Sequence, residues 1–223
     1  MSSQGKRAVL FANGALPAPE KLLSQIEKSD LLIAVDGGLN HMIALGLTPN
    51  LIIGDLDSAL PDDVRRFHEN GTVVRKFPEE KDETDLELAL QAALEFEPST
   101  ILVVAALGNR LDHTLGNLFL LTQPQFLNKD IRLIDGEQEV FLIDQSIEIT
   151  GMPGQRVSLL PLNGPVTGIQ TTGLQYPLNN ETLYPDKTRG ISNRMTGFSA
   201  TVKFQRGILL CIHSTKTPHP RND

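Results

Sequence analysis

The chain has 223 residues, of which 40% are hydrophobic and 21% are charged. This size and balance are ordinary for a globular protein of one large or two modest domains, and they exclude a small disulfide-stapled scaffold. The formal net charge is −7, from 27 acidic and 20 basic residues. The acidic balance argues against a general nucleic-acid surface and against adhesion to anionic membranes.

The sequence also lacks the segments that carry a chain into or across a membrane. No apolar run approaches the roughly 20 residues that span a bilayer, and the polar stretch before Ala8 does not have the pattern of a secretory signal. We therefore expect a cytoplasmic protein. The single cysteine, Cys211, lies in the apolar run 208–212 and is expected to be a buried thiol without a catalytic role.

The first part of the chain alternates short apolar runs with helical patterns. We predict strands over 8–11, 31–35, 51–53, 72–77 and 101–107, and helices over 19–28, 40–45, 61–70 and 85–96. The strand runs are apolar without alternation, as in strands that are covered on both faces, so we expect a parallel sheet. The last of these helices has the clearest pattern, because Thr84 and Glu87 before its apolar face have the spacing of a capping box.

The pattern changes after about Lys129. Strands are predicted over 131–134, 140–143, 156–160, 200–204 and 208–213. Glycine and proline separate these runs and helical periodicity is absent, which indicates short antiparallel strands in a sandwich or a barrel. The final segment, 215–223, has no apolar residue apart from two prolines, so we expect a disordered tail.

Acidic side chains follow the carboxyl ends of the predicted parallel strands. These acids are Asp36, Asp55, Asp57 and Asp112. The carboxyl ends of parallel strands share one edge of a sheet, and ligands bind in the crevice outside it, so these acids are expected to converge there around a cation. If the strand geometry continues through Asp55 and Asp57, their carboxylates project to the same side. Oxygen ligands without a Cys/His cluster favour Mg²⁺ over zinc.

Each of these features also has a purely structural interpretation. Asp55 to Ser58 fits a strand-end turn that caps the following helix. Lys81 to Asp85 opens a helix whose free N–H groups favour phosphate, and its acids suggest a metal ion that links Asp85 to the other carboxylates. Arg110 is suited to neutralise a transferring phosphoryl group, or it pairs with Asp112 on the surface.

Four motifs occur along the chain in an order and spacing that is typical of one known family. They are Asp36-Gly-Gly38, Gly54-Asp-Leu-Asp-Ser58, Lys81-Asp-Glu-Thr-Asp85 and Gly108-Asn-Arg-Leu-Asp-His113. Together they resemble the motifs of thiamin pyrophosphokinase. The later Ser192-Asn193 is similar to the vitamin-binding segment of that family. The resemblance therefore covers the whole chain apart from the tail.

The resemblance implies an α/β fold, with an N-terminal parallel-sheet α/β domain over residues 1–144 and a C-terminal antiparallel β-sandwich domain over 145–214. It implies an enzyme that transfers diphosphate from ATP to the hydroxyl of thiamin, giving thiamin diphosphate and AMP, with Mg²⁺ as cofactor. It also implies a homodimer with sites between subunits. No nucleic acid or membrane partner is expected.

The resemblance further implies roles for individual residues. The catalytic set is Asp36, Asp55, Asp57, Asp85, Arg110 and Asp112, of which Asp55, Asp57 and Asp85 bind the metal. The nucleotide-binding residues are Asn13, Lys81, Thr84 and Arg110, and the thiamin-binding residues are Asp36, Asp112, Ser192 and Asn193. In one respect the chain departs from the family: some members place a Trp near thiamin in the last strands, whereas this chain has no Trp and carries Ile208 near that place.

The expected reaction depends on alignment and charge neutralisation rather than on a covalent enzyme intermediate, since a primary alcohol attacks the β-phosphorus of ATP and AMP leaves. Either Asp112 or Asp36 accepts the hydroxyl proton. Three other functions fit an acidic crevice: a diphosphokinase acting on another heterocyclic alcohol such as a hydroxymethylpterin, a metal-dependent nucleotide phosphohydrolase, and a non-catalytic nucleotide or thiamin sensor. Ser192-Asn193 favours thiamin as acceptor, and a sensor has no use for four acidic motifs.

Overall fold

The computed structural model describes residues 7–108 and 110–216. The chain divides into two compact units, one ending at Gly136 and the other beginning at Glu137. Most of the predicted disordered tail, residues 217–223, lies outside the described part. Within the described ranges, no helix has both the length and the apolar character needed to cross a bilayer.

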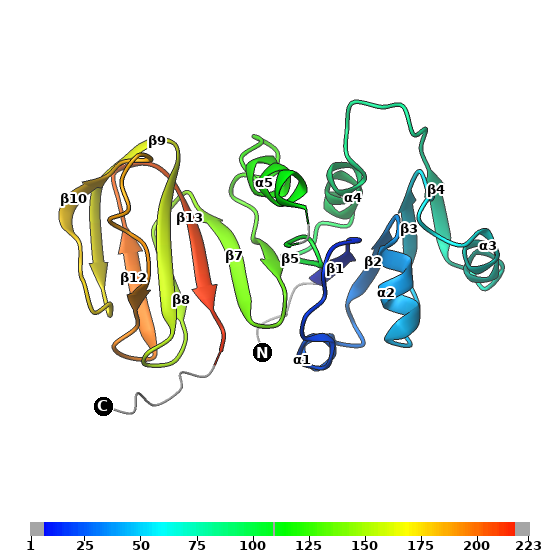
Figure 1. Ribbon diagram of the computed structural model, residues 1–223, viewed down its shortest axis with the longest axis horizontal. Coiled ribbons are helices and arrows are strands. Elements are labelled where there is room, and N and C mark those ends of the chain that lie inside the picture. The colour runs from blue at the N-terminus through cyan, green and yellow to red at the C-terminus, as the bar shows by residue number, and fades with distance from the viewer. Residues whose placement is uncertain (1–6, 109, 217–223) are drawn as a thin grey trace. The chain divides into compact units, whose positions relative to one another are not determined.

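Parallel strands form the sheet of the N-terminal unit (Figure 1). They are β1 (Arg7–Phe11), β2 (Leu31–Val35), β3 (Leu51–Gly54), β4 (Val73–Lys76), β5 (Thr100–Val104) and β6 (Ile131–Ile134). Their order is β4-β3-β2-β1-β5-β6, and every pair of neighbours is parallel, as predicted. The chain builds outward from β1 on one side and then returns to β5 on the other. The strand order therefore reverses between β1 and β5, which is where open α/β sheets bind ligands.

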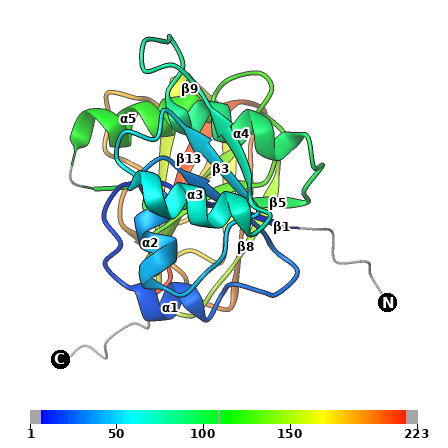
Figure 2. The same ribbon diagram turned by 90° about the vertical axis from the view of Figure 1, so that its right-hand side faces the viewer.

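Helices cover both faces of this sheet. They are α1 (Pro19–Leu23), α2 (Gly38–Ala44), α3 (Pro61–Glu69), α4 (Asp85–Leu94) and α5 (Leu111–Leu120). Leu22 of α1 and Leu39 of α2 share a buried cluster with Phe11 of β1. Helices α4 and α5 lie on the opposite side of the sheet (Figures 1 and 2). The sheet is thus buried on both faces, which explains why its strands read as continuous apolar runs.

Two predicted elements of this unit end three or more residues earlier in the structure. The helix predicted over 19–28 ends at Leu23, because the backbone N–H of Glu27 donates to the Asp30 carboxylate at 2.7 Å rather than to a helical carbonyl. The strand predicted over 101–107 ends at Val104, since Ala105 adopts a left-handed φ of 56°. The second change turns the chain out of the sheet directly at the edge where ligands bind.

The C-terminal unit is an antiparallel β-sandwich built around one long strand (Figure 1). One sheet joins β7 (Gln138–Ile143), β13 (Arg206–Ser214), the first half of β9 (Arg156–Thr172) and the short β11 (Asn193–Arg194). The other joins the second half of β9 with β10 (Asn179–Leu183) and β12 (Ser199–Lys203), which pairs with β8 (Ile147–Thr150). Strand β9 leaves the first sheet and enters the second at Asn163 and Gly164, where φ is 57° and 130°. The strand predicted over 156–160 therefore continues to Thr172, through the glycine and proline residues that were expected to end it.

Side chains from both sheets meet in one buried cluster, which includes Phe141, Ile149, Val202 and Cys211. Cys211 is a fully buried thiol, as predicted. The connection between β10 and β12 carries Ser192 and Asn193 at the edge of this unit.

Candidate active site

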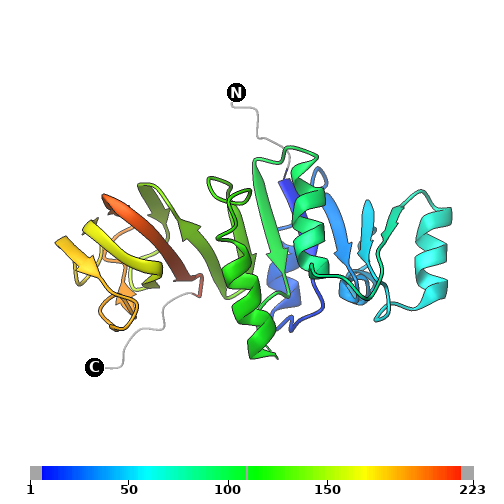
Figure 3. The ribbon, with the colours of Figure 1, turned by 90° about the horizontal axis from the view of Figure 1, so that it is seen from above.

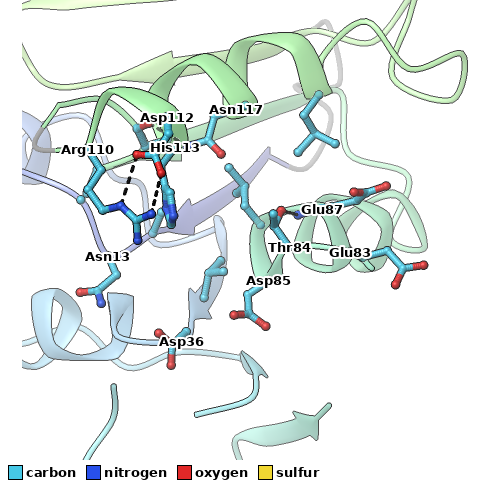
Figure 4. A pocket seen from close by; sticks show the side chains of 18 of the residues that line it. Asn13, Asp36, Glu83, Thr84, Asp85, Glu87, Arg110, Asp112, His113 and Asn117 are labelled. Carbon is cyan, nitrogen blue, oxygen red and sulfur yellow. Dashed lines mark hydrogen bonds and ion pairs between the residues drawn. The ribbon is translucent and has the colours of Figure 1, made fainter. Parts of the chain in front are cut away.

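A cleft of about 970 Å³ opens in the N-terminal unit. Segments that follow β1, β2, β3 and β5 line it, together with the start of α4 and residues of α5 (Figure 4). Its lining includes the predicted site residues Asn13, Asp36, Asp55, Asp57, Lys81, Thr84, Asp85, Arg110 and Asp112. Residues from six separate segments therefore converge at the carboxyl edge of the sheet, as the strand-end pattern predicted.

Close backbone packing explains the two glycines after Asp36. A Cβ on Gly38 would lie 1.7 Å from the carbonyl oxygen of Phe11, and a Cβ on Gly37 would lie 2.3 Å from Asn13 Nδ2. Only glycine allows α2 to begin this close to the end of β1. Asn13 and Asp36, which flank this close approach of β1 and α2, both lie in the wall of the cleft (Figure 4).

Three carboxylates form a compact group. Asp36, Asp55 and Asp57 each offer one oxygen, and these oxygens lie within 4.8 Å of one another. The extended strand geometry does not continue through Asp55 and Asp57, so it is not what brings their carboxylates together. Leu56 has a left-handed φ of 65°, and Asp55 Oδ1 accepts a hydrogen bond from Asp57 N at 3.2 Å. A tight turn, the structural alternative, therefore gathers the carboxylates, and Ser58 N ties it to Asp36 Oδ1 at 3.3 Å.

Asp85, at the start of α4, stands outside this group and pairs with Lys81. Asp85 Oδ1 is buried, accepts no well-aligned hydrogen bond among the described residues, and lies 3.1 Å from Lys81 Nζ. Burial raises the pKa of Asp85, and the charges of Asp55 and Asp36 raise it further against the opposing effect of Lys81. Burial alone would lower the pKa of Lys81, but Asp85 and Asp55 raise it overall. Lys81 therefore remains a cation within the cleft.

Thr84 caps the helix that carries Asp85. Its hydroxyl oxygen accepts a hydrogen bond from Glu87 N at 3.2 Å. This is the bond that the Thr84 side chain makes in the predicted capping box. Helices α4 and α5 run side by side when the molecule is seen from above (Figure 3), and Gln123 Nε2 donates to Glu87 Oε1 at 2.8 Å just beyond α5. Both side chains belong to the lining of the cleft.

Arg110 and Asp112 bind each other at the start of α5 (Figure 4). Arg110 Nη2 lies 2.6 Å from Asp112 Oδ2, and Nε lies 3.3 Å from Oδ1. The hydrogen bond to Arg110 lowers the pKa of Asp112 and raises that of Arg110. Both side chains are exposed, at 65% and 64%. Arg110 and Asp112 thus form the exposed ion pair that was the structural alternative for Arg110, and both residues also line the cleft.

Sequence reasoning missed several side chains of this cleft. They are Glu87, His113, Asn117 and Gln123. Asn117 Nδ2 donates to the carbonyl of Ala106 at 2.8 Å and so fixes α5 to the segment after β5. Recognising the helix over 111–120 would have placed His113 and Asn117, four residues apart, on one face of it.

Ser192 and Asn193 lie in the C-terminal unit and differ in their surroundings. Asn193 Nδ2 donates to the carbonyl of Tyr176 at 2.7 Å, and Oδ1 accepts from the N–H groups of Tyr176 and Arg194 at 3.0 and 2.9 Å. Ser192 is exposed and has a left-handed φ of 59°, and its N–H donates to Ser158 Oγ at 3.0 Å. The amide of Asn193 is therefore used within the protein, whereas the Ser192 side chain faces solvent.

Comparisons with known proteins connect both units to one family. Residues 22–134 match the model of the thiamin pyrophosphokinase catalytic domain, and residues 143–209 match that of the thiamin pyrophosphokinase vitamin B1 binding domain. The chain is 34% identical over 208 residues to thiamine pyrophosphokinase of Bacillus subtilis, covering 92% of this chain and 97% of the relative. It is 30% identical to thiamine pyrophosphokinase 1 of Arabidopsis thaliana, with 97% and 90% covered.

Solved structures agree with this match. The crystal structure of thiamine pyrophosphokinase from Bacillus subtilis superposes with a TM-score of 0.83 at 31% identity, covering 95% of this chain and all of the other. The structure of a thiamin pyrophosphokinase family protein from Enterococcus faecalis superposes with a TM-score of 0.80 at 27% identity, covering 96% of this chain and 100% of the other. Two matching domain models in the same order, together with relatives matched over nearly their full length, show that this chain belongs to the thiamin pyrophosphokinase family.

Proposed function

We propose that this chain transfers a diphosphate group from ATP to the hydroxyl group of thiamin, giving thiamin diphosphate and AMP. The observation that carries the proposal is the cleft at the strand ends, where grouped carboxylates stand with Lys81 and Arg110. Displacement at phosphorus needs positioning and charge neutralisation more than covalent chemistry. The matches to a catalytic and a vitamin B1 binding domain support thiamin as the acceptor.

Mg²⁺ fits this cleft as the cofactor. Three carboxylate oxygens lie within 4.8 Å of one another, and a buried oxygen of Asp85 lacks a well-aligned hydrogen bond within the described ranges. An all-oxygen donor set with a few carboxylates is what Mg²⁺ takes in proteins. Asp55, Asp57 and Asp85 would hold the ion with Asp36 beside them. When bound, it would neutralise charge on the phosphate oxygens.

The side chains of the cleft divide the remaining work. Lys81 and Arg110 supply positive charge for the triphosphate, and Asn13 and Thr84 line the same wall. The hydroxyl of Thr84 is occupied as the cap of α4, so its contribution is to hold the helix start in place. The pair with Arg110 lowers the pKa of Asp112 and weakens it as a base. We therefore favour Asp36 as the acceptor of the hydroxyl proton.

The proposed acceptor-binding residues are Asp36, Asp112, Ser192 and Asn193. Asp36 and Asp112 belong to the N-terminal cleft, and Ser192 offers an exposed hydroxyl from the C-terminal unit. Asn193 contributes through the backbone that it holds rather than through direct contact. A homodimer with sites between subunits and a cytoplasmic location stay predictions from the sequence.

Release of AMP separates this function from its alternatives. The protein is incubated with ATP and Mg²⁺, with thiamin, with a hydroxymethylpterin, or with neither. AMP that appears only with thiamin supports the proposal. Release without any acceptor indicates a phosphohydrolase, release only with the pterin indicates a different diphosphokinase, and no release under any condition indicates a sensor.

A further inference from the structure

We propose that Lys81 is the internal counter-ion of the acidic cleft, and that its ammonium group competes with a divalent cation for Asp85. In this arrangement Lys81 occupies the Asp85 carboxylate, and nucleotide phosphates draw the ammonium away. The inference rests on the proposed function for the second step only. The competition itself concerns the protein and a metal ion.

The contacts of Lys81 Nζ are those of a placed cation rather than of a solvated surface lysine. It donates to the carbonyl oxygen of Pro78 at 2.9 Å, and it lies 3.1 Å from Asp85 Oδ1 and 3.6 Å from Asp55 Oδ2. The ammonium therefore makes one hydrogen bond, to Pro78, and its charge lies next to two carboxylates. The Lys81 side chain is only 12% exposed. The ammonium is therefore held between two loops of the cleft.

Lys81 contacts both Asp85 and one carboxylate of the Asp36, Asp55 and Asp57 group. Asp36, Asp55 and Asp57 place their oxygens within 4.8 Å of one another, and Asp85 is not part of this group. The oxygen of Asp85 that pairs with Lys81 is the buried one without a well-aligned hydrogen bond in the described part of the chain. A metal ion bound to both Asp55 and Asp85 would meet the ammonium that now contacts both. Because the two positive charges repel, one must leave.

Lysine suits this exchange because its charge sits at the end of a flexible four-carbon stem. The stem starts in the loop before α4, so the ammonium can turn from Asp85 to phosphate oxygens without movement of the helix. Asp85 then becomes available to the metal. The arrangement predicts weak metal binding by the protein alone and coupled binding of metal and nucleotide.

A purely structural role for Lys81 predicts the opposite change in metal affinity. If Lys81 only fastened its loop to α4, its removal would loosen Asp55 and Asp85 and weaken metal binding. Removal of a competing cation instead leaves the same acids with more negative charge. The metal affinity of the nucleotide-free protein therefore separates the two roles, and it does so without measuring catalysis.

The test is a titration of the full-length protein with Mn²⁺, followed by electron paramagnetic resonance, and with Mg²⁺ by calorimetry, in the absence of nucleotide and thiamin. Lys81→Met is expected to lower the Kd for the ion by about tenfold. Lys129→Met is the matched control, because Lys129 is exposed and precedes β6 at the opposite edge of the sheet. It removes the same charge and is expected to leave the Kd within about twofold.

Two further variants keep the test decisive. Lys81→Gln retains a donor for the carbonyl of Pro78 and is expected to tighten metal binding as Lys81→Met does. It serves as the test if Lys81→Met does not fold. Lys81→Arg retains the charge and is expected to bind metal as the wild type does. An unchanged or raised Kd in folded Lys81→Gln would overturn the proposal.

A double-mutant cycle with Asp85→Asn locates the competition. In the wild type, Asp85→Asn is expected to change the Kd for Mn²⁺ little, because Lys81 occupies Asp85. In the Lys81→Gln background it is expected to undo the gain, so the two effects are not additive. Additive effects would contradict the assignment to Asp85. If thiamin is not a substrate, these titrations keep their meaning, since neither ATP nor thiamin takes part.

Discussion

The side-chain amide of Asn193 pairs with the backbone of Tyr176 in both directions, as a second peptide group would. Nδ2 donates to the Tyr176 carbonyl at 2.7 Å, and Oδ1 accepts from the Tyr176 N–H at 3.0 Å. This pair fixes the chain on which the exposed Ser192 stands. Ser192 and Asn193, which the sequence assigned together to thiamin binding, therefore have different tasks. Asn193 holds the segment, and Ser192 can contact a ligand.

Substitution of the two residues should separate these tasks. Ser192→Ala is expected to raise the KM for thiamin more than the KM for ATP and to leave the free energy of unfolding unchanged. Asn193→Ala is expected to lower the free energy of unfolding by about 0.5–1.5 kcal/mol, because it replaces the hydrogen bonds to Tyr176 with bonds to water. Steady-state kinetics and urea unfolding measure the two effects, with Ser199→Ala as control. An equal rise in the KM for ATP would show that the segment does not serve the acceptor.

The pair of Arg110 and Asp112 leads to a prediction about nucleotide affinity. Asp112→Asn removes the charge that engages Arg110, so the guanidinium becomes free to contact phosphate. We expect the Kd for ATP to fall by about two- to fivefold, which is the scale of an exposed ion pair. Calorimetric titration with ATP measures this. Weaker ATP binding in Asp112→Asn would mean that the two side chains act on the nucleotide as a unit.

The third prediction concerns the metal set. Asp57→Asn is expected to lower kcat by about 100-fold, because it removes one carboxylate from the group that would hold Mg²⁺. Asp57 is exposed, so the Tm should not change. Asp186→Asn, which removes an exposed carboxylate in the other unit, should leave kcat unaltered. Activity near that of the wild type at saturating Mg²⁺ would exclude Asp57 as a metal ligand.

The fourth prediction tests the account of the fold away from the cleft. The Asp30 side chain is 1% exposed and accepts hydrogen bonds from Arg7 Nε and Nη2 at 2.9 and 2.7 Å. Asp30→Ala is expected to lower the free energy of unfolding by about 3 kcal/mol, since Arg7 loses its buried carboxylate partner and keeps only Glu27 at 3.3 Å and the carbonyl of Gln25 at 2.8 Å. Asp62→Ala, which breaks an exposed pair with Arg65, should cost about 0.5 kcal/mol or less. Similar losses in both variants would contradict the importance of burial.

The sheet and its ligand-binding edge could be predicted from the sequence because their signals are local. Buried parallel strands give continuous apolar runs, and Asp36, Asp55 and Asp57 follow such runs directly. Helix α5 was missed although Leu111, Leu115 and Phe119 recur at the four-residue spacing of a helix. These side chains are 71%, 45% and 53% exposed in the structure, so this apolar face is not part of the core of the unit. The cleft residues on that helix were missed with it.

The convergence of the acids at one edge was predicted, but their detailed arrangement could not be, because it depends on contacts between segments that are distant in sequence. The turn at Leu56 and the hydrogen bond from Ser58 link Asp36 to Asp55 and Asp57. Asp85 lies outside this group and pairs with Lys81. A pattern of residue types specifies neither the turn nor the ion pair. Similarly, β9 continues through Gly164 because it changes sheets there, which only the partner strands reveal.

The fate of each phosphate of ATP tests the central claim most directly. Parallel reactions contain thiamin, Mg²⁺ and ATP labelled either on the γ-phosphate or on the α-phosphate. Transfer of an intact diphosphate predicts that the γ label appears in thiamin diphosphate and the α label in AMP, in equal amounts and only when thiamin is present. Recovery of the γ label as free phosphate or diphosphate, at the same rate with and without thiamin, would contradict the account.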